Sequence, residues 1–420
     1  MFVSEVSPFV SGLRDDSAQP PNHIVIGITH PQTCLTLTGR LRALREAGFH
    51  VTVISSPGEL LDRTAAREGV NAIAVPMQRD ISPFADLVSL ARLWWLLLRL
   101  KPDIAEFSTP KAGLLGNIAS WLARVPARIY MLRGLKLETS NGIKKALLLA
   151  SERAASACAQ VVLCNSQSMR AEAMALGVAP APKLRLIGDG SSNGVDVERF
   201  CPGPSNVRSQ LGFPQGALVV GYVGRLTTDK GVPELIEAFD TILKGKPDAH
   251  LLLVGWFDVS EDALASRWRV RIANHPRIHC TGFVSDTAPY YRAMDVMVLP
   301  SRREGFPNVV LEAAATGIPV ITTECTGARD SVVPEVTGLL IPPGYPEAIS
   351  EAALKLLREP ARRRMMGDAA RAWVCNHYSD ERVLRLAVSF YKSLLKPLAV
   401  ARPGDSLTPT GGGRQAEAAL

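Results

Sequence analysis

Short runs of β-branched and aliphatic residues alternate with longer helix-like stretches along most of the chain. The run HIVIGITH at 23–30 is followed by TLTGRLRALREAGF at 36–49, which we expect to be helical, and then by HVTVISS at 50–56. Such alternation is typical of parallel α/β units. The Gly-, Pro- and Asn-rich segment at 193–206 interrupts the pattern, and ALVVGYVGRL at 217–226 starts it again. The sequence therefore predicts an α/β fold with two Rossmann-like, doubly wound domains.

The domain bounds follow from this pattern. We expect one domain at 23–200, a second at 201–375, and a final helix at 376–399 that crosses back to the first domain. Residues 1–22 and 400–420 are rich in Gly, Pro, Ser and Ala, so we expect flexible tails there. Ligands of doubly wound sheets bind at the carboxyl ends of the strands, which predicts a site in a cleft between two facing domains.

Composition narrows the class of protein. Apolar residues make up 47% of the 420 residues and charged residues 21%, which is typical of a globular protein. The net charge of +7 permits phosphates, nucleotides or anionic lipid as partners. The sequence contains no block of Lys and Arg residues, so it does not predict binding to nucleic acid. Seven cysteines without a C-x-x-C motif predict reduced thiols in a cytosolic protein.

The chain shows neither a signal-peptide layout nor a membrane span. Its N-terminus lacks a charged segment followed by an apolar one. The apolar run LWWLLL at 93–98 is far shorter than the about 20 residues that a span needs. We therefore expect a soluble, cytoplasmic protein, with peripheral attachment to the inner face of the plasma membrane as a hypothesis.

One candidate phosphate-binding element is VVGYVGRLTTDKG at 219–231, which predicts a strand, a loop and a helix start. Gly224 lets the backbone approach a ligand closely. Arg225 offers a planar fork and Lys230 a point charge for phosphate oxygens, and the helix N-terminus adds positive potential. The spacing matches neither a Walker A loop nor G-x-G-x-x-G. Two solvated surface cations remain the alternative interpretation.

Two glutamates, Glu304 and Glu312, border a second predicted loop and helix. The strand DVMVLPSRR is followed by a turn at 304–307, and we expect Asn308 to be the N-cap of a helix over 309–315. Free backbone N–H groups at the helix start suit a diphosphate, and acceptor-only carboxylates suit sugar hydroxyls. The pattern predicts a sugar–phosphate ligand, and a capped surface helix with two solvated acids is the alternative.

These motifs together resemble one family. E-G-F-P-N-V-V-L-E, from Glu304 to Glu312, resembles the E-x7-E element of retaining GT-B glycosyltransferases of family 4. The resemblance to this family covers roughly residues 24–395. Further matching stretches are GRLTTDKG (224–231) to the donor-phosphate element, NGVDVERF (193–200) to the interdomain segment and TGLLIPPG (337–344) to the last donor-domain strand. STPKAGLLG (108–116) and RGLKLET (133–139) are similar to the bacterial subgroup that builds capsule, exopolysaccharide or lipid-linked oligosaccharide.

The resemblance implies a GT-B fold in which 23–200 binds the acceptor and 201–375 the nucleotide-sugar donor. Arg225 and Lys230 would hold the donor diphosphate and stabilise its charge as it leaves. Glu304 would contact the transferred sugar, and these three are the implied catalytic residues. Glu312 would bind the ribose, the amides of Asn308 and Val309 the phosphate, and the backbone of Phe283 and Val284, after Gly282, the base. Gly224, Gly305 and Phe306 complete the implied donor site.

The resemblance also implies the reaction. A hexose or N-acetylhexosamine passes from a UDP- or GDP-linked donor to a sugar or polyprenyl-diphosphate-sugar acceptor, with retention of configuration. The donor phosphate itself would deprotonate the acceptor, so Glu304 is not assigned as a nucleophile, unlike the carboxylates of retaining glycosidases. No metal and no cofactor are expected, since the chain has no Asp-x-Asp. The alternatives are a GT-B-fold UDP-sugar epimerase and a non-catalytic nucleotide-sugar-binding subunit.

The acceptor side departs from the family pattern. Two histidines that are common in the family are absent from this sequence, one in the segment around Thr109 and one at the position of Arg133. Arg133 is expected to contact a phosphate instead. The common Gly-Gly pair is replaced by HPQTCLTLTG, and the candidate cleft residues on this side are His30, Thr33, Thr38, Thr109, Lys111 and Arg133. Bulky Trp256 and Phe257 follow Gly255, so the shape of the donor pocket is expected to differ from that of the family.

Two helical stretches raise the question of a membrane. GIKKALLLASERAASA carries Lys144, Lys145 and Arg153 near an apolar face, and RLWWLLLRLK has two tryptophans. A basic amphipathic helix can lie on anionic lipid. A core-facing helix with a solvated face remains the alternative for both.

Overall fold

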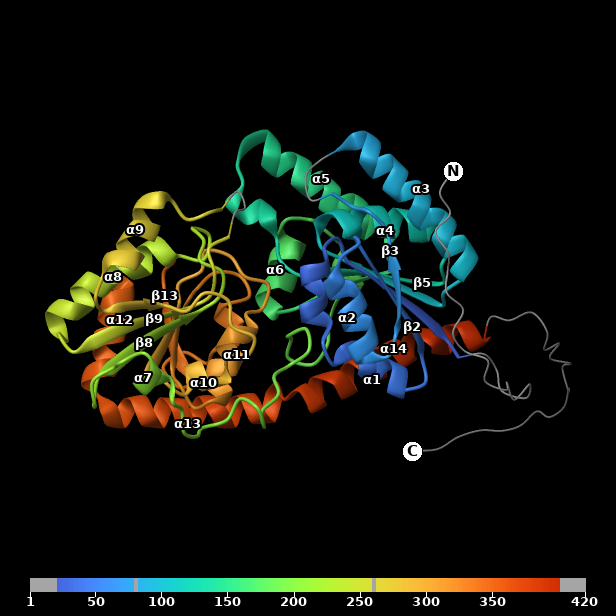
Figure 1. Ribbon diagram of the computed structural model, residues 1–420. Helices are drawn as coiled ribbons and strands as arrows, with labels where there is room; N and C mark the ends of the chain where they lie inside the picture. Colours follow the sequence, from blue (N-terminus) through green and yellow to red (C-terminus); the bar gives the residue numbers. More distant parts are fainter. Residues whose placement is uncertain (1–20, 79–81, 259–261, 401–420) are drawn as a thin grey trace, which may run out of the picture.

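The computed structural model describes residues 21–78, 82–258 and 262–400. The tails expected at 1–22 and 400–420 lie almost wholly outside these residues. Two parallel sheets, each covered by helices on both faces, form two domains side by side (Figure 1). The α/β class with two Rossmann-like domains is thereby confirmed.

The first sheet has the order β3-β2-β1-β4-β5-β6-β7. Its strands are β1 (His23–Gly27), β2 (His50–Ser55), β3 (Asn71–Ala74), β4 (Ile104–Ser108), β5 (Ala127–Leu132), β6 (Val161–Cys164) and β7 (Leu184–Leu186). Its helices are η1 (Pro31–Leu37), α1 (Arg40–Glu46), α2 (Glu59–Glu68), α3 (Pro83–Leu100), α4 (Pro110–Leu122), η2 (Lys136–Thr139), α5 (Gly142–Cys158), α6 (Gln167–Ala175) and η3 (Ala181–Lys183). Every residue of β1 and β4 is buried because helices cover both faces.

Alternate residues of β1 point to opposite faces and so enter separate cores. Ile24 and Ile26 pack with residues of α1 and α2, whereas Val25 packs with residues of α3 and α4. The chain thus reverses its winding between β1 and β4, which places a crevice at the carboxyl ends of these strands.

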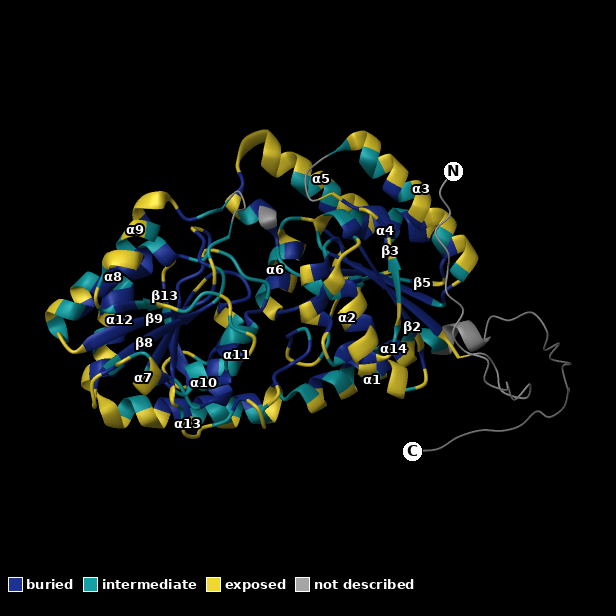
Figure 2. Cartoon of the chain, in the orientation of Figure 1, coloured by how far each residue is buried: buried dark blue, intermediate teal, exposed yellow. Residues whose placement is uncertain are grey.

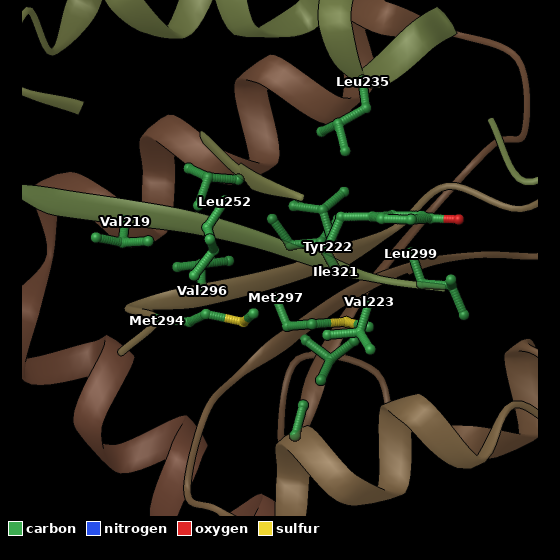
Figure 3. Close-up of a cluster of buried hydrophobic side chains, with 14 of the residues drawn as sticks. Val219, Tyr222, Val223, Leu235, Leu252, Met294, Val296, Met297, Leu299 and Ile321 are labelled. Carbon is green, nitrogen blue, oxygen red and sulfur yellow. The ribbon is translucent and has the colours of Figure 1, made fainter. Parts of the chain in front are cut away.

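The second sheet has the order β10-β9-β8-β11-β12-β13. Its strands are β8 (Leu218–Val223), β9 (Ala249–Val254), β10 (Ile278–Cys280), β11 (Val296–Leu299), β12 (Val320–Thr323) and β13 (Gly338–Ile341). Its helices are α7 (Val207–Gln210), α8 (Val232–Gly245), α9 (Ser266–Asn274), α10 (Ala288–Tyr291), α11 (Asn308–Ala315), η4 (Arg329–Ser331), α12 (Pro346–Arg358) and α13 (Pro360–His377). Figure 3 shows its core, where the fully buried Tyr222 lies among aliphatic side chains with its hydroxyl directed along the strand.

The last helix, α14 (Asp380–Val400), leaves α13 and runs beneath the first domain (Figure 1). Ala387 and Tyr391 are part of the first domain's core. The Tyr391 hydroxyl donates to the Glu106 carboxylate, which is also paired with the buried Arg40. Because an unpaired charge is costly in a core, this triad ties the end of the chain to β4.

Two local expectations are wrong by a few residues. The helix expected at 36–49 begins only at Arg40, because Gly39 has a φ of +77° and separates α1 from the 3₁₀ helix η1. Asn308 is the first residue of α11 rather than its N-cap, because the extended Pro307 already occupies the cap. The seven cysteines are all free thiols, as expected.

Candidate functional site

Two adjoining cavities lie at the carboxyl ends of the strands, between the domains. The first cavity is lined by Thr109, Pro110, Tyr130, Met131, Gly134, Arg225, Asp229 and Arg303. The second cavity is lined by Thr36, Asn165, Ser192, Tyr222, Val223, Gly224, Leu299, Phe306, Pro307, Asn308 and Val309. Arg133, Lys230, Glu304 and Gly305 border both cavities. A reactant in one cavity would therefore meet a reactant in the other beside these four residues.

Close contacts between backbone segments at glycines shape the second domain's side of the cleft. A Cβ on Gly255, which has a φ of +157°, would lie 1.8 Å from the Gly224 carbonyl oxygen. Gly255 also forms a β-bridge with Gly282. The loops after β8, β9 and β10 thus form a continuous row, and at Gly255 only glycine fits against the neighbouring loop.

Lys230 and Glu304 meet at the boundary of the cavities. Lys230 Nζ donates to Glu304 Oε1 at 2.7 Å, and both side chains are mostly buried. Gly231, with a φ of +70°, brings this loop against the end of β11, since a Cβ there would lie 2.1 Å from the Pro300 carbonyl oxygen. Two motifs that are 74 residues apart in the chain are thereby brought into contact.

Arg225 is held by an acid that the sequence analysis missed. Its Nη1 donates to Asp258 Oδ2, and the Tyr222 hydroxyl donates to its carbonyl oxygen at 2.6 Å. Burial alone would lower the pKa of Arg225, but the hydrogen bond and charge of Asp258, together with the charge of Asp229, raise it above its ordinary value. Arg225 is therefore a permanent cation whose guanidinium has a fixed direction.

Glu312 lies inside α11 and is half-buried. The hydroxyl of the fully buried Tyr291 donates to its Oε2 at 2.8 Å. Burial raises the pKa of Glu312, and the Tyr291 hydrogen bond and the charge of Arg199 act against this rise. Arg199 belongs to the interdomain segment, so the Glu312 carboxylate is stabilised by a hydrogen bond from α10 and by a positive charge from that segment.

Arg133, which follows β5, faces both cavities. Its Nη1 donates to Ser192 Oγ at 3.3 Å, but its buried Nε and Nη2 have no hydrogen-bond partner among the described residues. Burial and repulsion from Arg40 lower the pKa of Arg133 to about 10, with Glu106 acting against the shift. The guanidinium is still charged at neutral pH, so it can bind an anion in the cleft.

Several expected site residues lie outside both linings. His30 Nδ1 accepts from the Gln32 backbone N–H and caps η1, and Thr38 Oγ1 donates to the Leu35 carbonyl. Lys111 pairs with Asp86 at 2.7 Å. The expected residues that do not border either cavity are His30, Thr33, Thr38, Lys111, Gly282, Phe283, Val284 and Glu312. Thr36 of η1 borders the second cavity, whereas its neighbours Thr33 and Thr38 do not.

The domains touch directly at the cleft. A Cβ on Gly305 would lie 1.9 Å from the Arg133 carbonyl oxygen, so the turn after Glu304 packs against the loop after β5. Ser168 Oγ donates to Asp330 at 2.6 Å and accepts from the Gly327 N–H at 2.7 Å. These contacts hold the two linings together.

Within the ranges that the structure describes, no three His, Cys, Asp or Glu side chains are grouped as metal ligands. None of the helices in these ranges combines the length and the apolarity that crossing a membrane requires.

Two α/β domains that face each other across a cleft at the carboxyl ends of their strands are the architecture of the GT-B class of sugar-transferring enzymes. Comparison with known families agrees with this. Residues 217–359 match the model for glycosyl transferases group 1, and residues 37–190 match that for the glycosyl transferase 4-like domain. The chain belongs to the glycosyl transferase group 1 family and is a glycosyltransferase.

Relatives span almost the whole chain. It is 35% identical over 372 residues to the capsular polysaccharide biosynthesis glycosyltransferase CapM of Staphylococcus aureus, covering 88% of this chain and 96% of that protein. It is 31% identical over 337 residues to the UDP-Gal:α-D-GlcNAc-diphosphoundecaprenol α-1,3-galactosyltransferase of Escherichia coli, covering 76% and 84%. HepE of Anabaena, solved with UDP and glucose, shares the fold with a TM-score of 0.73 at 20% identity, over 88% of this chain and 99% of that one.

Proposed function

We propose that this enzyme transfers a hexose or N-acetylhexosamine, with retention of configuration, from a UDP- or GDP-linked donor to a lipid-linked sugar acceptor during bacterial surface polysaccharide synthesis. The observation that carries this proposal is the Lys230–Glu304 pair, which lies where the two cavities meet. The names of the two relatives above support the pathway and the type of acceptor.

The donor occupies the second cavity in this proposal. Asn308 and Val309 at the start of α11 border it, so their backbone N–H groups and the positive helix end face the diphosphate. Lys230, at the boundary of the cavities, and Arg225, which borders the adjoining first cavity, supply the cations. Glu312, on α11 outside both linings, accepts from the ribose hydroxyls where the donor extends beyond the second cavity. The base lies further along the row of glycines, where the exposed rings of Trp256 and Phe283 are 5.5 Å apart at 70° and form a stacking surface.

Charge separation during transfer explains the residues shared by the cavities. As the bond from the sugar to the diphosphate breaks, negative charge grows on the phosphate and positive charge on the sugar carbon. Lys230 and Arg225 stabilise the former. Glu304 accepts a hydrogen bond from the sugar and lies beside the developing positive charge. The acceptor hydroxyl loses its proton to the departing phosphate oxygen on the same face, which retains configuration without a carboxylate nucleophile.

The acceptor occupies the first cavity. Arg133 and Arg303 border it and can pair with a phosphate on a diphosphate-linked acceptor. Reaction at a membrane surface follows from such an acceptor, because its lipid remains in the bilayer.

A product assay with a panel of UDP- and GDP-sugars and a diphospholipid-linked monosaccharide tests the proposal. We expect one donor to give a disaccharide whose new bond keeps the donor's anomeric configuration by NMR. Glu304→Ala should abolish transfer while the protein stays folded, and Glu347→Ala, an exposed acid on α12, should not. Full activity of Glu304→Ala, or an inverted product, would refute the proposed site or mechanism respectively.

A further inference from the structure

Helix α3 exposes a continuous apolar stripe to solvent. The residues of the stripe follow one another at helical spacing and are Phe84, Leu87, Val88, Trp94, Trp95 and Leu98. Phe84 is 89% exposed. The opposite side of the same helix is apolar as well, and Leu93 and Leu97 are buried there in the domain core. The domain core covers only one of the two apolar sides, so the exposed side indicates a second binding partner.

The stripe is extended by two neighbouring helices. On α5, Ile143 is 90% exposed and Leu147 is exposed beside it; at the end of α4, Trp121 and Leu122 are exposed. Both α3 and α5 pack against α4. Figure 2 shows exposed residues along the outer sides of α3 and α5, which form the same edge of the molecule. We call this surface the α3–α5 face.

Charge on the α3–α5 face has one sign. Its helices contain two acids, and neither is exposed: Asp86 is half-buried and paired with Lys111 at 2.7 Å, and Glu152 is buried and accepts from Tyr130. The exposed cations of the three helices are Arg92, Arg99, Lys144, Lys145 and Arg153. Apolar and aromatic side chains surrounded by cations, without an exposed carboxylate, complement an anionic lipid surface. Tryptophan in particular is favoured at the depth of the headgroups.

The α3–α5 face begins at the rim of the first cavity. Pro110, the first residue of α4, lines that cavity, and the Lys111–Asp86 pair joins the first turn of α4 to the first turn of α3. The first turns of α3 and α5 project at the same edge in Figure 1. A flat surface resting on this face therefore ends beside the cavity to which the acceptor was assigned.

We infer that the α3–α5 face docks on the surface of an anionic bilayer and thereby presents a lipid-linked acceptor to the first cavity. The apolar stripe enters the headgroup region, and the cations contact lipid phosphates. The purpose of docking rests on the proposed function, since only a lipid-linked acceptor requires it. The docking itself requires neither donor nor acceptor, so it is measured separately from transfer.

Flotation of the full-length protein with two kinds of vesicles tests the inference: equal parts of phosphatidylglycerol and phosphatidylcholine, and phosphatidylcholine alone. We expect binding to the anionic vesicles that weakens with salt. Phe84→Asp/Leu87→Asp should lose about tenfold or more in partitioning, because two apolar side chains leave the interface and two negative charges are added. Lys144→Glu/Lys145→Glu should also weaken binding to the anionic vesicles, by about tenfold.

The matched control is Val270→Asp/Met365→Asp, which alters two exposed apolar residues of the second domain and should bind as the wild type does. Thermal melting checks that each variant is folded, and Ile143→Asp on α5 provides a second test should the α3 variant not fold. Phe84→Asp/Leu87→Asp should still transfer sugar to a water-soluble acceptor, which separates lost docking from a failed site. The inference is overturned if the wild type does not float with anionic vesicles, or if the variants of the α3–α5 face float as well as the wild type. It is also overturned if the substitutions change only the oligomeric state of the protein, which would show that the face binds a second copy of the chain.

Discussion

Lys230 Nζ lies 2.7 Å from Glu304 Oε1, and this pair marks the boundary between the two cavities. We expect Lys230→Ala to lower kcat by about a hundredfold to a thousandfold, because the leaving phosphate loses a preorganised cation. Steady-state kinetics with the preferred donor measure this. Lys355→Ala, which removes a lysine from α12 far from the cleft, should leave kcat unchanged. Equal rates for the two variants would contradict the role given to Lys230.

Arg225 is neutralised in part by Asp258. We expect Asp258→Asn to strengthen UDP binding by about threefold to tenfold, because the asparagine preserves a hydrogen bond while the negative charge next to the diphosphate is removed. Titration calorimetry with UDP measures the Kd. Weaker binding would show instead that Asp258 is needed mainly to orient Arg225.

Burial raises the pKa of the half-buried Glu312, and the hydrogen bond from Tyr291 acts against this rise. In Tyr291→Phe the lost hydrogen bond lets the pKa of Glu312 rise further, so the carboxylate is protonated at a higher pH than in the wild type. Donor KM should therefore increase on acidification at a higher pH in this variant. Its unfolding free energy should fall by about 1–3 kcal/mol because a buried acceptor loses its donor. An unchanged pH profile of KM would argue against a ribose contact by Glu312.

Gly305 packs against the loop after β5 of the other domain. A methyl group there would lie 1.9 Å from the Arg133 carbonyl oxygen, and backbone cannot move aside as a side chain can. We expect Gly305→Ala to widen the cleft and to lower kcat/KM at least about tenfold, since small misplacements of reacting groups are costly. Gly245→Ala is the control, because its Cβ would meet only the flexible side chains of Leu354 and Arg358. Similar kinetics for the two variants would show that the domains do not need this contact.

Glu152, buried beneath the cleft residue Tyr130, predicts a pH dependence of stability. Burial raises the pKa of Glu152 from 4.5 to about 7. The folded protein then binds the proton of the Glu152 carboxyl more tightly than the unfolded chain does. The contribution of Glu152 to stability therefore falls as pH rises from 4.5 to about 7. Glu152→Gln should therefore gain in Tm relative to the wild type between about pH 5 and pH 8. A constant difference in Tm across this range would show that Glu152 does not titrate as described.

Parts of the fold were predictable from sequence because strands buried on both faces leave unbroken apolar runs, as at 23–27 and 249–254. The short strand β3 (Asn71–Ala74) lies at the sheet edge, is partly exposed and contains only three apolar residues, so it was not predicted. The start of α1 was misplaced because a single positive φ at Gly39 ends one helix and begins another.

The site was predictable only where its residues lie in one motif. The Glu304–Glu312 loop and the Gly224–Lys230 loop each carry their chemistry within a few residues. Their contact through Lys230 and Glu304 depends on packing between residues that are 74 positions apart, which no local pattern contains. Asp258 and Tyr291 were missed for the same reason: each acts on a partner at least 21 positions away.

Because Ala387 and Tyr391 belong to the core of the first domain, that domain is completed by residues synthesised long after its last strand, β7 (Leu184–Leu186). While the ribosome is still producing the second domain, the Arg40–Glu106 pair lacks its tyrosine partner, and the apolar surface of α1 lacks part of its cover. The two halves of the enzyme thus mature together rather than in order of synthesis. A nascent chain that stops short of α14 would be a substrate for chaperones or proteases.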